Sequence, residues 1–215
     1  MSKWLERFKK SRNLIFTKDD FKKYSLNVKE EFNFFKKYLK RGSKVLECGC
    51  GLGCTAVPLS HYYDITCIDI DKEVLKYAKI NGKNFGKNMK FKLIDVFDVD
   101  KKFKEDSFDA CTHGGFIEHF PEKKIKRLLK KQLKIAPLII FSMPIRTKYN
   151  LKAYKTRKTR TGEVHIDQIY RNLWTKKYWL NTILKDFNVV EFKEAGNKYS
   201  ISGLDELMVV IKRQD

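Results

Sequence analysis

The chain has 215 residues and a formal net charge of +20 at pH 7, and 42% of its residues are hydrophobic. This composition excludes an intrinsically disordered chain, and the length suits one sizeable core rather than two. The longest apolar runs are too short to cross a bilayer, and the first residues lack the apolar core of a signal peptide. We therefore expect a cytoplasmic protein with no membrane partner.

The excess of Lys and Arg leaves two interpretations open. It could serve a polyanionic partner, because these side chains supply the nonspecific affinity for nucleic acid. It could equally reflect a general bias in composition, since the lysines are spread along nearly every segment of the chain. Nucleic acid binding therefore stays open but is not favoured.

Five cysteines occur in or beside the predicted strands, namely Cys48, Cys50, Cys54, Cys67 and Cys111. Their odd number and their positions indicate reduced, buried small residues rather than a disulfide framework. The first three lack the spacing of a zinc site, and no second cluster of Cys or His follows, so we expect no metal.

The predicted elements begin with helices. Residues 1–24 are expected to form one or two short helices, and the spacing of Val28, Phe32, Phe35 and Leu39 predicts an amphipathic helix that packs on a sheet. Strands and helices then alternate. Strands are predicted over residues 44–48, 65–69, 89–94, 108–112, 138–142, 188–192 and 206–211. Helices are predicted from near Thr55, over 72–84 with Asp71 as N-cap, around Ile125–Leu133, and over 174–187.

Repeated strand–helix units predict an α/β fold with a doubly wound, mostly parallel sheet and helices on both faces. The last two strands lie close together in sequence and should form a hairpin-like pair, which makes one of them antiparallel. No repeat or Pro/Gly-rich linker divides the chain, so residues 1–215 are expected to form a single domain.

The most informative motif joins the first two strands. The first strand ends at Glu47 and continues into Gly49-Cys50-Gly51-Leu52-Gly53, and the second ends at Asp69. Glycines let a backbone approach a ligand where no Cβ intervenes, and a carboxylate at the next strand end can accept both ribose hydroxyls. The motif therefore predicts a nucleoside-bearing cofactor.

A third strand end, at Asp95, adds another carboxylate. Three acidic strand ends suit a cofactor that carries a positive charge and hydroxyls, and they do not suit a pyrophosphate dinucleotide. Cys54 also stands where the third glycine of the dinucleotide fingerprint would fall.

With these motifs the sequence resembles the class I, Rossmann-like S-adenosylmethionine-dependent methyltransferases, from about Val28 to Ile211. The segment 108–119 resembles the fourth motif of that family, which ends in Glu-His in many small-molecule members, here Glu118-His119. The family's seven-stranded sheet with its last strand antiparallel agrees with the hairpin expected above. The resemblance implies a methyltransferase that uses S-adenosyl-L-methionine.

The resemblance also implies roles for individual residues. Glu47 and the turn Gly49, Cys50, Gly51 and Gly53 would hold the methionine moiety. Asp69 would bind the ribose hydroxyls, and Ile70 would pack on the adenine. Asp95 would face the adenine amino group with Val96 beside it, and His113 would lie near the sulfonium. Plainer interpretations stay open: Asp95 as a turn cap, Glu118 as a solvated residue at a helix start, and His119 as a helix cap.

Methyl transfer from a sulfonium is a direct displacement, so the protein mainly aligns the reactants. A general base is needed only if the acceptor is protonated, and histidine suits that task at neutral pH. His113 and His119 are the candidates near the sulfonium, and His165 is the candidate from above.

Two segments are expected to build the acceptor pocket over the sheet: residues 1–27 as an N-terminal helical cap and residues 143–174 as a basic lid. The lid carries Arg146, Lys148, Lys152, Lys155, Arg157, Lys158 and Arg160, and a turn over 161–165 would place His165 near the pocket mouth. This charge would suit an anionic small-molecule acceptor, although a solvated loop fits equally well.

Motifs for exocyclic base amines and for cytosine carbon-5 are missing, which favours a small-molecule O or N acceptor. The alternatives are an RNA methyltransferase that uses the basic lid, a cofactor-binding subunit without turnover, and, least favoured, a nicotinamide oxidoreductase.

Overall fold

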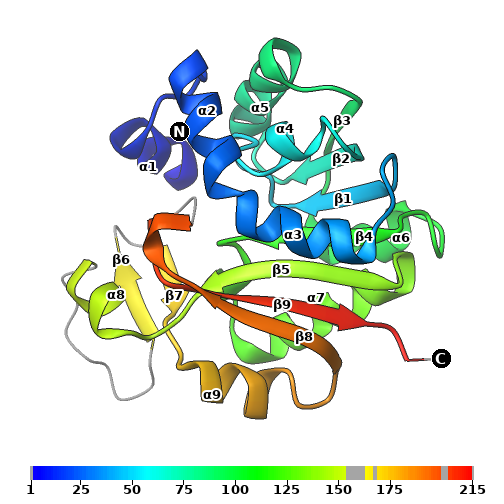
Figure 1. The fold of residues 1–215 in the computed structure, drawn as a ribbon, viewed down its shortest axis with the longest axis vertical. Helices are drawn as coiled ribbons and strands as arrows, with labels where there is room; N and C mark the ends of the chain where they lie inside the picture. The colour runs from blue at the N-terminus through cyan, green and yellow to red at the C-terminus, as the bar shows by residue number, and fades with distance from the viewer. Residues whose placement is uncertain (1, 154–162, 167–168, 200–202, 215) are drawn as a thin grey trace.

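The computed structural model describes residues 2–153, 163–166, 169–199 and 203–214. A seven-stranded sheet runs through the molecule with helices on both faces (Figure 1). Its strand order is β3-β2-β1-β4-β5-β9-β8. The strands are β1 (Lys44–Cys48), β2 (Asp64–Asp69), β3 (Met89–Leu93), β4 (Ala110–Gly114), β5 (Leu138–Pro144), β8 (Asn188–Ala195) and β9 (Glu206–Lys212).

The directions of the strands confirm the predicted doubly wound, mostly parallel sheet. β1 pairs in parallel with β2 on one side and with β4 on the other, and β4 in turn pairs with β5. β9 runs antiparallel to both of its neighbours, β5 and β8, and it is the predicted antiparallel member of the final hairpin. The order reverses between β1 and β4, and ligands of such sheets bind beyond the carboxyl ends of the strands at this point.

The helices confirm most of the predicted elements. They are α1 (Lys3–Ser11), α2 (Lys18–Asn27), α3 (Lys29–Tyr38), α4 (Ala56–Leu59), α5 (Lys72–Phe85), α6 (Val99–Lys102), α7 (Glu122–Ile135), α8 (Lys148–Ala153) and α9 (Lys176–Tyr178). Short turns are η1 (Val96–Asp98), η2 (Ile117–His119), the π-helical η3 (Trp179–Ile183) and η4 (Asn197–Tyr199). Asp71 caps α5 as predicted, since its side chain accepts from the backbone N–H groups of Glu73 and Val74.

Alternating side chains of the strands face two different cores. On β1, Val45 packs with α3, α4 and α5, whereas Leu46 packs with α7 and η3. On β5, Ile140 belongs to the first core and Phe141 to the second. This alternation decides which strand-end residues reach α3 and which are covered by α7.

Several elements differ from their predicted bounds; β5 and β8, for example, continue to Pro144 and Ala195. β4 lies two residues later than expected and includes His113. The predicted helix over 174–187 is shorter, because Thr175 caps α9 and the chain continues as η3 only to Ile183. A two-stranded antiparallel sheet of β6 (Glu163–Ile166) and β7 (Ile169–Asn172) lies where the sequence predicts a turn within a lid.

All five cysteines are free and buried, as their positions in the sequence indicate. Among the helices of the described residues, none combines the length and the hydropathy that a membrane span requires.

Candidate active site

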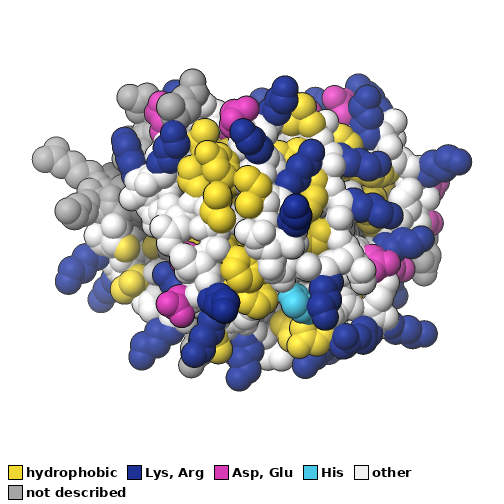
Figure 2. Space-filling model, turned by 90° about the horizontal axis from the view of Figure 1, so that it is seen from above, with side chains coloured by type: hydrophobic (Ala, Val, Ile, Leu, Met, Phe, Trp, Pro, Cys, Tyr) yellow, Lys and Arg dark blue, Asp and Glu magenta, His cyan; other side chains and the backbone are white. Residues whose placement is uncertain are grey.

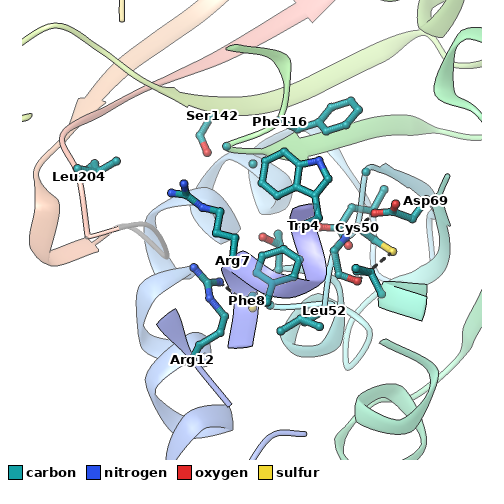
Figure 3. Close-up of a pocket in the computed structure, with 18 of the residues that line it drawn as sticks. Trp4, Arg7, Phe8, Arg12, Cys50, Leu52, Asp69, Phe116, Ser142 and Leu204 are labelled. Carbon is teal, nitrogen blue, oxygen red and sulfur yellow. Dashed lines mark hydrogen bonds between the residues drawn. The ribbon is translucent and has the colours of Figure 1, made fainter. Parts of the chain in front are cut away.

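A cavity of about 420 Å³ lies at the carboxyl ends of β1, β2, β4 and β5. Helix α1 covers it with Trp4, Arg7 and Phe8, and Arg12 follows as the C-cap of α1. In Figure 3, Trp4 lies beside Cys50 and Phe8 lies beside Leu52. The far end of the cavity is lined by Ser142 of β5, Glu206 of β9 and Leu204. Its size is in the range of small-molecule and cofactor sites.

The glycine turn after β1 forms one wall of this cavity. Gly49 has φ +68° and Gly51 has φ +53°, backbone conformations that residues with a Cβ rarely adopt. A Cβ on Gly49 would lie 2.2 Å from Cδ2 of Phe116, and one on Gly51 would lie 3.2 Å from Cζ of Phe8. The turn therefore requires glycine for its conformation and for the close packing of the two aromatic rings.

Asp69 connects this turn to the end of β2. Its carboxylate accepts the N–H of Gly51 at 3.0 Å and the N–H of Asp71 at 2.9 Å, one on each oxygen. Burial raises the pKa of Asp69, and the two backbone donors oppose this shift. Ile70, the next residue, is 68% exposed and lines the cavity, so an apolar side chain lies open beside the carboxylate.

Glu47 ends β1 on the face that carries α3 and is only 4% exposed. Burial raises the pKa of its carboxyl well above the usual range, and the nearby Glu31 carboxylate adds to the shift. Of the predicted cofactor residues, Glu47, Gly49, Cys50, Gly51, Asp69 and Ile70 all line the cavity.

Four predicted cofactor residues lie outside the lining: Gly53, Asp95, Val96 and His113. A Cβ on Gly53 would lie 3.1 Å from Val57, so this glycine packs against α4. Asp95 caps η1 by accepting the N–H of Phe97 at 2.9 Å, which is the turn-cap interpretation left open above, and Val96 is buried.

His113 points away from the cavity because it lies on the α7 face of β4. It is 1% exposed, and its ring lies 4.8 Å from that of Phe141 and 5.9 Å from that of Phe116, centroid to centroid. Burial lowers its pKa to about 3. The structure thus makes His113 a neutral core residue, and we do not retain it as a base or as a cofactor contact.

His119 is also held in place as a neutral residue. Its Nδ1 lies 2.7 Å from the carbonyl oxygen of Tyr170, to which it can donate, and Arg171 donates to its Nε2 at 3.3 Å. Burial and, to a smaller extent, the adjacent Arg171 together lower the pKa of His119 to about 3. With both ring nitrogens engaged, His119 is poorly suited to the predicted role of general base.

Glu118 is neither solvated nor at the start of a long helix. It is 0% exposed, and Arg171 of β7 lies 3.1 Å from its Oε1. This buried ion pair connects η2 to the small sheet of β6 and β7 beside the cavity, which Arg171 also lines. Sequence reasoning missed the pair.

The predicted lid is described only in part. The residues Lys155, Arg157, Lys158 and Arg160 lie outside the described residues, and so does the side chain of His165, whose backbone belongs to β6. Among the lid residues that the structure describes, Ala153 of α8 and Arg171 of β7 line the cavity. The base role of His165 and the lid function of 143–174 stay predictions.

Sequence reasoning also missed Glu31 of α3, which lines the cavity and accepts a hydrogen bond from Oγ of Ser142 at 2.7 Å. Glu206, 5% exposed at the start of β9, lines the same end. Burial raises the pKa of Glu31 to about 7, and the Glu206 carboxylate contributes to the shift.

The placement of His113 leads to a prediction about acid stability. Its folded pKa of about 3 lies below the unfolded value near 6.5, so the unfolded state takes up a proton first as the pH falls. The neutral His113 ring therefore does not lower the free energy of unfolding above pH about 6.5. The free energy of unfolding then decreases as the pH falls from about 6.5 toward about 3. We expect wild type to lose stability relative to His113→Phe by up to about 1.4 kcal/mol per pH unit in this window. Urea unfolding of both proteins across the window measures the difference; parallel pH profiles would contradict the neutral buried ring.

Comparison with known proteins agrees with this architecture. Residues 45–135 match the family model described as a methyltransferase domain. Norajmaline N-methyltransferase of Rauvolfia serpentina is 30% identical over 115 residues, which are 51% of this chain and 39% of that protein. A crystal structure of a protein from Pyrococcus horikoshii OT3 has a TM-score of 0.74 at 16% identity and covers 100% of both chains. The structure of 1,6-didemethyltoxoflavin-N1-methyltransferase of Burkholderia thailandensis has a TM-score of 0.65 at 18% identity, covering 89% of this chain and 80% of that one.

The sheet order and the likeness to these solved structures show that the chain has the class I, Rossmann-like methyltransferase fold. Residues 45–135, from β1 to the end of α7, are the stretch that matches the methyltransferase-domain model. The matched stretches span 27 to 39% of the length of three curated relatives.

Proposed function

We propose that this chain is an enzyme that binds S-adenosylmethionine in the cavity and transfers its methyl group to a nitrogen or oxygen atom of a small molecule. The observation that carries the proposal is the wall formed by the glycine turn, Asp69 and Ile70. It offers exposed backbone, a carboxylate and an open apolar side chain in the order that a methionine moiety, a ribose and an adenine would need.

The residues present fit this cofactor. Asp69 would accept the ribose hydroxyls, because each carboxylate oxygen has one backbone donor and further acceptor capacity. Ile70 would pack on the adenine, and Glu47 with the turn from Gly49 to Gly51 would receive the positively charged methionine moiety. Asp95 and Val96 stay outside this arrangement.

When bound, the cofactor supplies a methyl group that is already activated on a sulfonium. The protein therefore has to hold an acceptor in line with that methyl group and keep water away, and proximity provides most of the acceleration. Trp4, Phe8 and Phe116 supply apolar surface around the cavity for this purpose (Figure 3).

The comparisons support a small-molecule acceptor, since the names of the Rauvolfia and Burkholderia relatives state small-molecule N-methylation of their own substrates. Figure 2 shows Lys and Arg side chains distributed over the visible face rather than gathered in one patch. This distribution favours a small molecule over RNA, for which clustered positive charge is the usual footprint.

Calorimetry and labelled methyl transfer test the proposal together. We expect S-adenosylmethionine and S-adenosylhomocysteine to bind and NADH not to bind. Label from the methyl group should enter the small-molecule fraction of a cell extract rather than its RNA. Tighter binding of NADH would contradict the cofactor, and cofactor binding without transfer to any fraction would indicate a subunit without turnover.

A further inference from the structure

The floor of the cavity beyond β4 and β5 is built from oxygen atoms of three elements. A Cβ added to Gly114 would lie 3.4 Å from Oγ of Ser142, 3.6 Å from Oε1 of Glu31 and 3.6 Å from Oγ1 of Thr55. The missing side chain at Gly114 thus leaves a space about the size of a methyl group that these oxygens surround. A small polar group of a ligand at this position would meet acceptor oxygens on several sides.

Carboxyl groups gather at this end of the cavity. Glu47 and Glu206 lie on the same face of the sheet as Ser142 and line the cavity with Glu31. The lining also holds Arg7, Arg12 and Arg171; Arg12 donates to Sγ of Cys54 at 3.5 Å, and Arg7 and Arg171 both act on the buried Glu118. A ligand group that donates hydrogen bonds therefore fits the floor better than a carboxylate or phosphate, which would lie against these oxygen atoms and carboxyl groups.

Glu31 is also the described group best placed to move a proton. His113 faces the other core, and both ring nitrogens of His119 are engaged. Glu31 lies at the cavity, is fixed by the Ser142 hydroxyl, and has a pKa raised to about 7 by burial and by Glu206. A carboxyl with this pKa exchanges protons near neutral pH, where a general base is most effective.

We propose that the methyl acceptor is an amine and that Glu31, held by Ser142, receives its nitrogen above Gly114 and accepts its proton. This inference rests on the proposed function and specifies the acceptor class. It departs from the anionic acceptor that the lid composition suggests, because the lid lysines lie outside the described residues and the described floor is acidic.

The proposed methyl transfer involves the acceptor ammonium, the Glu31 carboxylate and the methyl sulfonium of the cofactor. An acceptor ammonium gives one N–H proton to the Glu31 carboxylate, which frees the nitrogen lone pair. The nitrogen then forms a bond to the methyl carbon while the carbon–sulfur bond breaks and its electron pair stays on the sulfur. The products are the methylated ammonium ion, S-adenosylhomocysteine and a protonated Glu31 that returns its proton to solvent.

The first arm of the test identifies the chemical class of the product. The probe is S-adenosylmethionine labelled in its methyl group, and the acceptor pool is the small-molecule fraction of a cell extract. We expect the label in products that a cation exchanger retains at neutral pH and that survive alkaline hydrolysis, as N-methyl groups do and methyl esters do not. Label in base-labile or anionic products would overturn the amine assignment and leave the proposed function standing. No label in any fraction would overturn both.

The second arm tests Glu31 on the labelled product fraction. Glu31→Gln keeps the shape and hydrogen-bonding capacity of the side chain, and we expect kcat/KM to fall about 100-fold or more with unchanged affinity for S-adenosylhomocysteine. Glu30→Gln is the matched control, because Glu30 is adjacent on α3, pairs with Lys193 and does not line the cavity. If Glu31→Gln lost affinity for S-adenosylhomocysteine by as large a factor as it lost kcat/KM, Glu31 would hold the cofactor. This result would overturn its role at the acceptor. Full activity of Glu31→Gln would overturn it as well.

A third variant tests the space above Gly114. Gly114→Ala introduces a methyl group at ordinary contact distance from its neighbours, so the variant should fold and bind S-adenosylhomocysteine like wild type. We expect its KM for the acceptor fraction to rise at least about tenfold, because the methyl group occupies the proposed nitrogen position. An unchanged KM would contradict that position.

Discussion

Replacement of Asp69 by alanine should weaken S-adenosylmethionine binding about 10- to 150-fold, which corresponds to about 1.5–3 kcal/mol for hydrogen bonds to a charged group. The variant loses the acceptor proposed for the ribose hydroxyls. It also releases the N–H groups of Gly51 and Asp71, so the glycine turn is no longer tied to the end of β2. Calorimetric titration with S-adenosylmethionine measures the change.

Two further variants serve as controls for the loss of affinity in Asp69→Ala. Asp64→Ala removes a carboxylate from the other end of the same strand, where the side chain is exposed and distant from the cavity lining, and should bind normally. Asp69→Asn keeps one acceptor oxygen and should lose less affinity than Asp69→Ala. Unchanged affinity in Asp69→Ala would refute the assignment of the ribose site.

The cofactor side of the cavity could be predicted from sequence because its determinants are local. The turn from Gly49 to Gly53 follows β1 directly, and Asp69 ends the next strand of a parallel sheet. In such a sheet the carboxyl ends of neighbouring strands lie at one edge, so adjacency in space follows from the order of the elements. The antiparallel final strand is predicted on other grounds, namely the short connection between the last two strands and the resemblance to the methyltransferase family.

His113 shows how a small error in register changes a functional assignment. The sequence predicts a strand over 108–112 and leaves His113 in the loop beyond it, free to face a ligand. The observed β4 extends to Gly114, and the alternation of side chains then places His113 beside Cys111 on the α7 face. Gly114, one residue later, faces the cavity instead.

The position of Glu31 in the sequence could have identified it as a candidate site residue. The apolar residues Val28, Phe32, Phe35 and Leu39 mark the buried stripe of α3, and Glu31 lies within it, four residues before Phe35. A carboxylate on the buried face of an amphipathic helix is costly unless it has a partner or a function. Its actual partner, Ser142, is far away in sequence and could not be read from the helix.

The pairing of Glu118 with Arg171 had no comparable signal. The two residues belong to η2 and to β7, and the intervening chain includes α7, β5 and α8. Such a contact depends on how the small sheet of β6 and β7 lies against the large one, which neither periodicity nor charge spacing encodes. The basic composition of the lid instead predicts that its lysines and arginines bind an anionic acceptor.

Replacement of Arg171 by methionine should therefore destabilise the fold by about 3–5 kcal/mol, the cost typical of leaving one partner of a buried ion pair alone. Glu118 would stay 0% exposed without its cation, although Arg7 would still act on it. Burial already raises the pKa of Glu118, and Arg171 opposes that shift, so its removal should raise the pKa further. A carboxyl whose folded pKa is raised destabilises the fold as the pH rises through that range. The loss in the free energy of unfolding of Arg171→Met relative to wild type should thus be larger at pH about 8 than at pH about 5. Urea unfolding of both proteins at the two pH values measures this difference.

The double variant Glu118→Gln with Arg171→Met separates lost charge from lost packing. If the unpaired charge of Glu118 causes the destabilisation of Arg171→Met, adding Glu118→Gln should restore most of the stability of that variant. In wild type, Glu118→Gln should instead lower the stability, because it leaves Arg171 without its anion. Equal effects of Glu118→Gln in both backgrounds would mean that the two residues do not interact energetically. A pH-independent deficit would mean that Arg171 stabilises the contact between η2 and β7 through its stem rather than through its charge.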